Sequence, residues 1–347
     1  MEDSEKKSLT VSSASSSSSS SSSNSNIDDK TTSSLRKRIV VMGGTGRQGG
    51  ATARRLLELG CFDVIVLSRQ PPDSLDCKDL ISKGFQTVQA NALDLASLKR
   101  AFTGAWGVYG VTNPFTGARW TGSGIKPTTD TNAEVQQGKN IADAARFCGV
   151  KLLIFASAAS ALESTGVATM EAKANVERYI QTLDSLPCAI LCPVGFYENM
   201  LSPFAGLKQF YIPGLVKRDR PVQMVSLDDI GYFAGMMFND PEKWAGKRLE
   251  IAGDEISSED IARVIGKVRN EEGKWKIVTL PGWVFSMFVP AAVANVRTFL
   301  EERGAHVNIA ELRRDLHPGL QDFETWCKVK GLDKRVFPQP SSLCSIV

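Results

Sequence analysis

The strongest constraint on this chain is a glycine-rich stretch between an apolar run and a helix-forming run. Residues 38–41 read RIVV, residues 43–50 read GGTGRQGG, and residues 51–59 read ATARRLLEL. The glycines fit both G-x-x-G-x-x-G and G-x-G-x-x-G. In a strand-turn-helix context, such a turn lets the backbone approach a pyrophosphate, whose charge the helix N-terminus receives. The stretch therefore predicts a dinucleotide-binding turn.

Strand-like and helix-like segments alternate after this turn. Strands are expected at 64–67, 85–90, 106–111 and 152–156, with helices that include 96–102 and 133–148. A continuous apolar run such as Val64–Leu67 is typical of a parallel strand that is buried on both faces. The alternation predicts an α/β fold: a doubly wound parallel sheet of the Rossmann type, with ligands at the carboxyl ends of its strands.

Changes in composition divide the chain into four segments. Residues 1–34 contain a serine run and few large apolar residues, so we expect a disordered tail, either phosphorylatable or an unconstrained extension. Residues 35–194 are the predicted NADP-binding Rossmann domain, and part of the later chain is expected to return to its sheet. Residues 195–331 are expected to form a smaller mixed α/β lobe, and residues 332–347 a flexible tail.

Charge and cysteine usage exclude several classes of function. The chain has 41 basic and 38 acidic residues, so nothing indicates direct binding of nucleic acid. Its seven cysteines lack metal-ligand spacing and its histidines number two, so no metal site is predicted. Reduced thiols, and a polar N-terminus without signal-peptide character, favour a cytoplasmic protein, with the nucleus as a further location.

The chain ends in Cys344-Ser345-Ile346-Val347, which fits the C-a-a-X prenylation pattern. Valine is not among the usual residues at the last position, and no polybasic run adjoins the motif. We therefore expect membrane association only if Cys344 is prenylated, and one lipid would give weak attachment.

The end of the second strand indicates which dinucleotide fits. An NAD site needs a carboxylate there for the ribose, whereas an NADP site needs a cation for the extra phosphate. The strand ends in Ser68 and Arg69, and Asp63 precedes the strand. This pattern predicts NADP(H), with Arg69 as phosphate ligand and Ser68 as hydrogen-bond donor; the alternative is an ordinary loop arginine.

The ends of the third and fourth strands supply further candidates. Asn91 and Ala92 are expected to line the adenine pocket. Thr112 and Asn113 are expected beside the nicotinamide ribose, although Asn-Pro also signals a simple turn. The following residues, 115–131, are rich in glycine and proline and are long enough for a mobile flap.

A helix around Lys173 is the expected place for catalysis. Short-chain dehydrogenases use Tyr-x-x-x-Lys, because a spacing of four places both side chains on one helix face. Here the position four residues before Lys173 is Thr169, an aliphatic hydroxyl that is a poor acid. Lys173 is therefore a candidate cofactor ligand and catalytic residue, or else a surface lysine. A simple alcohol dehydrogenase is disfavoured, whereas reduction of a conjugated substrate needs mainly hydride from the cofactor.

Four motifs resemble the signatures of the NmrA-like family of atypical short-chain dehydrogenases. They are residues 43–50 (GGTGRQGG), residues 134–139 (EVQQGK), Lys173 and residues 193–199 (PVGFYEN), and the resemblance covers roughly residues 37 to 331. It implies a Rossmann domain that binds NADP(H) and a smaller C-terminal domain. The pattern is most similar to the redox-sensor members, which respond to the NADPH/NADP ratio through their conformation and partners. Other relatives, similar to isoflavone and quinone reductases, keep the lysine and reduce substrates.

Two functions are consistent with these motifs. One is an NADP(H)-dependent redox sensor or regulator that acts on a protein partner, with little or no classical dehydrogenase activity. The alternative is an NADPH-dependent reductase of a quinone or another small conjugated substrate. Phe196 and Asn199 are expected at the nicotinamide, or else at a helix start with the aromatic residue in the core. The predicted cofactor contacts are Gly43, Thr45, Gly46, Arg47, Gln48, Gly49, Ser68, Arg69, Asn91, Ala92, Thr112, Asn113, Lys173, Phe196 and Asn199.

The strand end at Ser68 and Arg69 yields a prediction about cofactor choice. NADPH should bind more tightly than NADH, because only NADPH carries a phosphate for the guanidinium. Titration of the protein with each cofactor measures this, and equal affinity would contradict the assignment.

Overall fold

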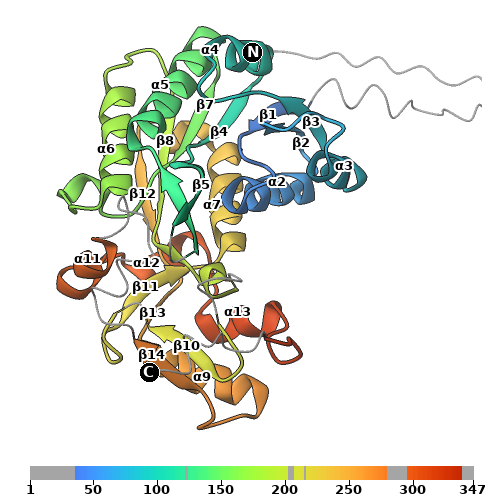
Figure 1. The fold of residues 1–347 in the computed structure, drawn as a ribbon. Helices are drawn as coiled ribbons and strands as arrows, with labels where there is room; N and C mark the ends of the chain where they lie inside the picture. Colours follow the sequence, from blue (N-terminus) through green and yellow to red (C-terminus); the bar gives the residue numbers. More distant parts are fainter. Residues whose placement is uncertain (1–35, 122–123, 202–206, 215, 280–294, 338–347) are drawn as a thin grey trace, which may run out of the picture. The chain divides into compact units, whose positions relative to one another are not determined.

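A seven-stranded parallel sheet is the central element of the structure (Figure 1). The computed structural model describes residues 36–121, 124–201, 207–214, 216–279 and 295–337; the Ser-rich tail and Cys344 lie outside these ranges. The strand order β12-β8-β7-β4-β1-β2-β3 reverses direction between β1 and β4. The strands are β1 (Lys37–Val41), β2 (Phe62–Ser68), β3 (Gln86–Gln89), β4 (Gly107–Val111), β7 (Leu152–Ala156), β8 (Cys188–Pro193) and β12 (Arg248–Ile251).

This sheet confirms the predicted α/β doubly wound fold. Every neighbouring pair of its strands is parallel. Side chains alternate between the two faces, so Val41 and Ile154 belong to one apolar core and Val40 and Leu153 to the other. Both faces are covered, which explains why these strands are continuous apolar runs.

Helices cover the sheet on both faces (Figure 1). One core contains residues of α2 (Arg47–Leu59) and α7 (Leu227–Asn239), and the other contains residues of α4 (Leu95–Phe102), α5 (Thr131–Phe147) and α6 (Ala168–Gln181). The short helix α3 (Leu75–Ser82) lies between β2 and β3 in the chain. The first core includes Ala51 and Ala53, just after the glycine turn, and the second includes Val176, three residues after Lys173.

The later chain contributes directly to the Rossmann sheet. Strand β12 pairs with β8, and α7 packs against α2 so closely that a Cβ on Gly231 would lie 2.8 Å from the carbonyl oxygen of Ala51. Ser226 caps α7 by accepting a hydrogen bond from the backbone N–H of Asp229. Residues beyond 195 therefore complete the sheet as well as building the smaller lobe.

The smaller lobe contains two further sheets and several short helices. β9 (Gly195–Phe196), β11 (Val222–Val225) and β13 (Asp254–Ile256) form one sheet, and β10 (Tyr211–Gly214) pairs with β14 (Lys276–Thr279). The remaining helical segments of the described chain are η1 (Ala161–Glu163) and α8 (Pro241–Trp244), which pack against α6 and α7 of the sheet domain, and η2 (Tyr197–Leu201), α9 (Ser258–Arg269), α11 (Val296–Glu302), α12 (Ile309–Glu311), η4 (Leu312–Leu316) and α13 (Phe323–Val329). Tyr197, Phe323 and Trp326 form the centre of the lobe's apolar core.

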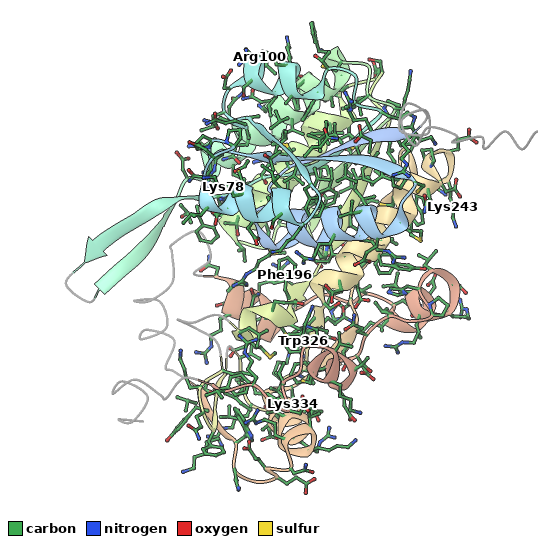
Figure 2. The ribbon with its side chains drawn as sticks, turned by 90° about the vertical axis from the view of Figure 1, so that its right-hand side faces the viewer. Lys78, Arg100, Phe196, Lys243, Trp326 and Lys334 are labelled. Atoms are coloured by element: carbon green, nitrogen blue, oxygen red, sulfur yellow. The ribbon has the colours of Figure 1, made fainter. Side chains whose placement is uncertain are left out.

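The segment expected as a loop, residues 115–131, contains a β-hairpin instead. β5 (Phe115–Thr121) and β6 (Gly124–Thr129) pair antiparallel, and Figure 2 shows them as an arm that projects from the sheet domain. Proline signalled a loop, but Pro127 opposite Ala118 is compatible with pairing here, because each strand of a two-stranded ribbon has a free edge.

Gly49 gives a prediction for stability. A Cβ at this position would lie 2.2 Å from the carbonyl oxygen of Met42 and 2.4 Å from that of Gly43. Gly49→Ala should therefore lower the free energy of unfolding by about 1–3 kcal/mol, since backbone atoms must move to relieve the overlap. Urea unfolding measures the effect.

Gly195 is the matched control, because a Cβ there meets no atom of the described residues within 4 Å. Gly195→Ala should change the free energy of unfolding by less than about 0.5 kcal/mol. Equal losses in the two variants would show that the close approach at Gly49 does not constrain the turn.

Candidate functional site

The glycine turn presents an open helix N-terminus. Gly43 has a φ of 63°, and Gly46 caps α2 without any side-chain hydrogen bond or an acidic residue in the first turn. The first N–H groups of α2 therefore carry the helix's partial positive charge without an anion from the chain itself. A Cβ on Gly44 would lie 2.0 Å from Cγ1 of Val66, so the turn is pressed against β2. The outer positions Thr45 and Arg47 are exposed.

Gln48 anchors the first turn of α2 to β4. Its Oε1 accepts a hydrogen bond from the hydroxyl of Tyr109 at 3.3 Å. Tyr109 is fully buried, and this burial raises the pKa of its hydroxyl well above the ordinary range. The phenol thus acts as a neutral donor that fixes the turn across the point where the strand order reverses.

The end of β2 presents an exposed cation. Ser68 is buried, and its Oγ accepts a hydrogen bond from the backbone N–H of Gln70 at 3.0 Å. Arg69 is exposed, and within the described ranges its guanidinium has no hydrogen-bond or ion-pair partner. Asp63 lies at the other end of β2, where it pairs with Arg38 at 3.0 Å. Arg69 is thus available to an external anion.

The loop after β3 is fixed by its own side chains. Asn91 is exposed, and its Oδ1 accepts a hydrogen bond from the backbone N–H of Leu93 at 3.0 Å. The carbonyl oxygen of Ala92 accepts one from Asn140 Nδ2 on α5 at 2.9 Å. The side-chain carbonyl of Asn91 is therefore committed to the turn, and its amide group is the part that can donate to a ligand.

Lys173 lies in a cluster with Thr112 and Glu134, which we call the lysine cluster. Lys173 Nζ is 3.1 Å from Thr112 Oγ1, 3.2 Å from Glu134 Oε1 and 3.4 Å from the carbonyl oxygen of Ala156. The hydroxyl of Thr112 donates to Glu134 Oε1 at 2.8 Å. These contacts bring together α6, α5 and the carboxyl ends of β4 and β7.

Glu134 is the residue of this cluster that sequence reasoning missed as a site residue. Its carboxylate is fully buried, and Oε2 has no hydrogen-bond partner among the described residues. A buried carboxylate is stable only beside a compensating charge, and the ammonium of Lys173 supplies it. Glu134 begins the motif at 134–139, so the signal was present, but nothing in that motif indicated its partner.

The rest of that motif positions the loop after β4. Gln137 accepts a hydrogen bond from the backbone N–H of Asn113 at 2.9 Å and donates one to its carbonyl oxygen at 3.0 Å. Asn113 Oδ1 in turn accepts from the backbone N–H of Phe115, as a turn-forming asparagine does. Gly138 allows α5 to approach α6, since a Cβ there would lie 2.3 Å from Val176 Cγ2.

A second buried carboxylate lies one helical turn beyond Lys173. Glu177 Oε1 accepts a hydrogen bond from Ser157 Oγ in the loop after β7, and Glu177 Oε2 accepts one from Arg248 Nε at 3.0 Å. Thr169 occupies the position of the dehydrogenase tyrosine, and no tyrosine of the described ranges contacts Lys173. The site therefore offers an ammonium but no phenol to donate a proton.

Arg47 and Asn199, two predicted contacts, are hydrogen-bonded to each other. Arg47 Nη1 donates to Asn199 Oδ1 at 2.6 Å, across 152 residues of sequence. Phe196, half-buried in β9, lies between the sheet domain and the lobe that holds Trp326 (Figure 2). The structure thus joins the middle of η2 to the first residue of α2.

The two residues before Asn199 belong to the core of the smaller lobe. Tyr197 is fully buried, and its ring centroid is 5.3 Å from that of Trp326. Glu198 accepts hydrogen bonds from Trp326 Nε1 at 3.0 Å and from the backbone N–H of Leu227 at 3.2 Å. Tyr197 therefore belongs to the core of the smaller lobe, and Glu198 joins that lobe to the first residue of α7.

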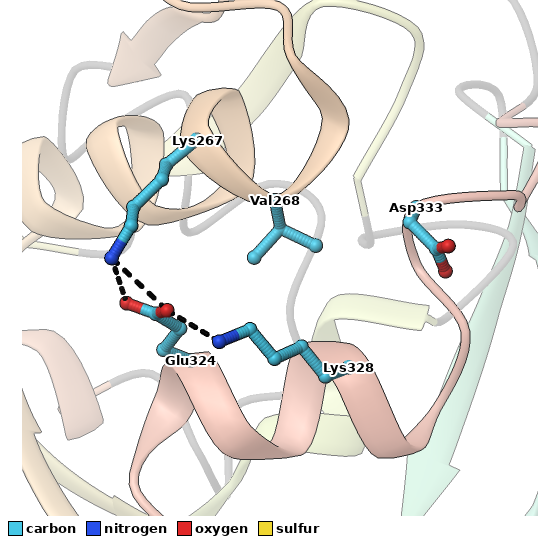
Figure 3. Close-up of a pocket in the computed structure, with 5 residues that line it drawn as sticks. All are labelled: Lys267, Val268, Glu324, Lys328 and Asp333. Carbon is cyan, nitrogen blue, oxygen red and sulfur yellow. Dashed lines mark hydrogen bonds and ion pairs between the residues drawn. The ribbon is translucent and has the colours of Figure 1, made fainter.

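A surface cavity of about 280 Å³ lies between α9 and α13, away from the predicted contacts (Figure 3). Its lining residues are Lys267, Val268, Glu324, Lys328 and Asp333. Glu324 accepts from Lys267 at 2.8 Å and from Lys328 at 2.7 Å, and these contacts lower its pKa to about 2. The described residues contain no group of three or more metal-ligating side chains and no helix long and apolar enough to cross a membrane.

The family of the chain follows from its match to a family model. The model of the NmrA-like family matches residues 35–315. The chain belongs to the NmrA-like family. It is similar to the NmrA-like family domain-containing oxidoreductase FrzB of Cladobotryum sp., at 30% identity over 78% of this chain and 89% of the relative. A relative in Dictyostelium discoideum, named only as containing the family domain, is 24% identical over 68% of this chain and 78% of its own.

Solved structures of two further proteins share the fold. The structure of a Citrobacter sp. triphenylmethane reductase complexed with NADP(H) covers 84% of this chain and 99% of its own, with a TM-score of 0.66 and 16% identity. Nmra, described as a negative transcriptional regulator, covers 86% of this chain and 95% of its own, with a TM-score of 0.65 and 20% identity. The same fold thus serves a reductase and a regulator.

Glu198 yields a prediction for pH dependence. Burial raises the pKa of its carboxyl above the ordinary 4.5, against the hydrogen bonds from Trp326 and Leu227. The folded state then binds this proton more tightly than the unfolded chain, so the stability it contributes is present below pH 4.5 and is lost as pH rises through the folded pKa. In Glu198→Gln this loss disappears. Unfolding free energies measured from about pH 4 to pH 7 should show the variant gaining relative to wild type.

Glu324→Gln is the control of opposite sign. Because the pKa of Glu324 is lowered, its stabilisation is present above pH 4.5 and is lost as pH falls toward about 2. With the measurement extended down to about pH 2, the unfolding free energy of this variant should fall relative to wild type as pH rises from about 2 to 4.5. The change should be smaller than for Glu198→Gln, since solvent screens the ion pairs of Glu324. If the difference in unfolding free energy between Glu198→Gln and wild type does not change with pH, burial does not raise the pKa of Glu198.

Proposed function

We propose that this protein binds NADP(H) and acts as a sensor of the cofactor's redox state. The glycine turn and the N-terminus of α2 would receive the pyrophosphate, Arg69 the 2′-phosphate and Lys173 the nicotinamide ribose. The fit rests on two observations: Cβ atoms at Gly44 and Gly49 would occupy space already filled by Val66 and by the backbone, and Arg69 has no partner within the described ranges. Bound NADPH would supply a hydride.

The hydrogen bond between Arg47 and Asn199 carries the proposed route from bound cofactor to the smaller lobe. Because the phosphates are the same in NADPH and NADP⁺, this route would report that cofactor is bound, and groups around the nicotinamide ring would distinguish the two redox states. The hydrogen bond joins the first residue of α2, where a phosphate would bind, to η2. A phosphate competes for the guanidinium of Arg47, because charge-assisted bonds to phosphate are stronger than a bond to a neutral amide. Tyr197 and Glu198, which precede Asn199 in the chain, both contact Trp326 in the smaller lobe. Release of Asn199 from Arg47 would therefore alter the contacts of that lobe.

The chemistry of the site supports sensing over classical dehydrogenation. Thr169 replaces the phenol, the hydroxyl of Ser157 already donates to Glu177, and Lys173 is held by Glu134. A response to cofactor needs a receiver, so we propose a regulated protein partner in the cytoplasm. Weak membrane association is part of this proposal only if Cys344 is prenylated.

A reductase of a quinone or another conjugated small molecule is the second candidate. It is favoured by relatives such as FrzB, which is named an oxidoreductase. The side chain of Lys173 is 16% exposed, so part of it is accessible to a bound molecule. Such a substrate needs hydride from the cofactor, and its proton can come from water.

The sensor proposal predicts that Asn199 transmits cofactor binding to the smaller lobe. In wild type, addition of NADPH should change amide hydrogen exchange in η2 and α13. In Asn199→Ala this change should be lost in α13, while NADPH affinity changes by less than about fivefold, because the turn and Arg69 remain.

Asn175→Ala is the matched control, since Asn175 also accepts from an arginine, Arg178, at 3.0 Å but lies on the exposed side of α6. It should leave the change in hydrogen exchange intact. The same change in α13 of Asn199→Ala as in wild type would overturn the proposed route.

Turnover separates the two candidate functions. NADPH consumption should be near background against a panel of quinones and enones if the protein is a sensor. Turnover that disappears in Lys173→Ala would instead establish the reductase.

A further inference from the structure

The lysine cluster carries a further inference, which rests on the proposed binding of NADP(H). We propose that Glu134 is a specificity-determining residue that sets the preference between NADP⁺ and NADPH. It would do so by cancelling the charge of Lys173 beside the nicotinamide ring.

The two forms of the cofactor differ at the nicotinamide ring. The ring carries a positive charge in NADP⁺ and none in NADPH, and the phosphates and the adenosine are the same in both. A binding site can therefore discriminate between them through the charges that lie around the ring. In a doubly wound sheet the dinucleotide crosses the point where strand order reverses, which here lies between β1 and β4.

The lysine cluster lies on the nicotinamide side of that point. Thr112 directly follows β4, and Ala156, whose carbonyl accepts from Lys173, is the last residue of β7. An ammonium alone at this place would repel the oxidised ring and so favour NADPH. The strength of this preference depends on the negative charge that lies beside the ammonium.

Glu134 is suited to supply this counter-charge. Its Oε1 lies 3.2 Å from Lys173 Nζ, and the carboxylate is fully buried, so water screens it little. Oε2 has no hydrogen-bond partner in the described part of the chain, so no donor there neutralises that oxygen. The other buried carboxylate of this region, Glu177, is paired with Arg248. The pair of Lys173 and Glu134 thus presents a net charge near zero to the ring.

A double-mutant cycle tests the inference through the ratio of the dissociation constants, Kd of NADP⁺ divided by Kd of NADPH. Glu134→Gln keeps the shape of the side chain and leaves the ammonium uncompensated. The ratio should therefore rise by roughly four- to sixteenfold, the scale for unit charges on the order of 10 Å apart at an effective dielectric constant of about 20 to 40. Lys173→Met should lower the ratio by a similar factor. The double variant, again neutral, should return it to near the wild-type value.

Asp143→Asn is the control, because it removes a carboxylate from the same helix, nine residues beyond Glu134 and hydrogen-bonded to Tyr179. It should leave the ratio unchanged. Calorimetric titration of each variant with both cofactors at one pH and ionic strength gives the ratios. Thermal unfolding identifies any variant that fails to fold. If Lys173→Met does not fold, Glu134→Gln and the double variant still test the inference.

The outcomes separate this inference from the proposed function. If both dissociation constants rise together and the ratio stays constant, Glu134 is merely structural and the inference is overturned, while NADP(H) binding stands. If wild type binds neither form, the proposed function fails and takes the inference with it.

Discussion

The buried carboxylate of Glu134 is the contact on which the carboxyl ends of the central strands depend. It accepts from Thr112 after β4 and from Lys173 on α6, so one charged group connects both halves of the predicted nicotinamide site. Its helix, α5, also holds the loop after β4 through Gln137 and the loop after β3 through Asn140. A single helix therefore orders three of the elements that would face a cofactor, and the cost of burying its carboxylate is offset by the ammonium it positions.

The sequence predicts the features that depend on local chemistry. Apolar runs such as Val64–Leu67 predicted parallel strands, and the glycine spacing predicted the turn before α2. Features that depend on tertiary contact were not accessible. Neither the partner of Glu134 nor the bond from Arg47 to Asn199 can be read from spacing, and the hairpin at 115–129 was mistaken for a loop because its prolines and glycines were weighed without its pairing.

The polar groups around the site are largely satisfied by one another. Ser157 donates to Glu177, Glu177 accepts from Arg248, and Lys173 reaches three acceptors of the chain. Groups held in this way lose little on binding a ligand, because they need no further ordering. They are also poor proton donors in a reaction, since each transfer would break a buried contact. The same arrangement thus favours firm recognition of a cofactor over turnover of an alcohol.

Gly138 has a consequence for how the protein can respond. Because Gly138 has no side chain, the backbone of α5 lies against the side chain of Val176 on α6, which a Cβ would overlap. Tight packing of this kind resists small shifts between the two helices, so it helps to hold the separation of Glu134 and Lys173. The exposed Asn199 lies on a different element, η2, after β8. In the proposed sensor, the charges that detect the ring and the residue that reports it would therefore stand on mechanically separate elements.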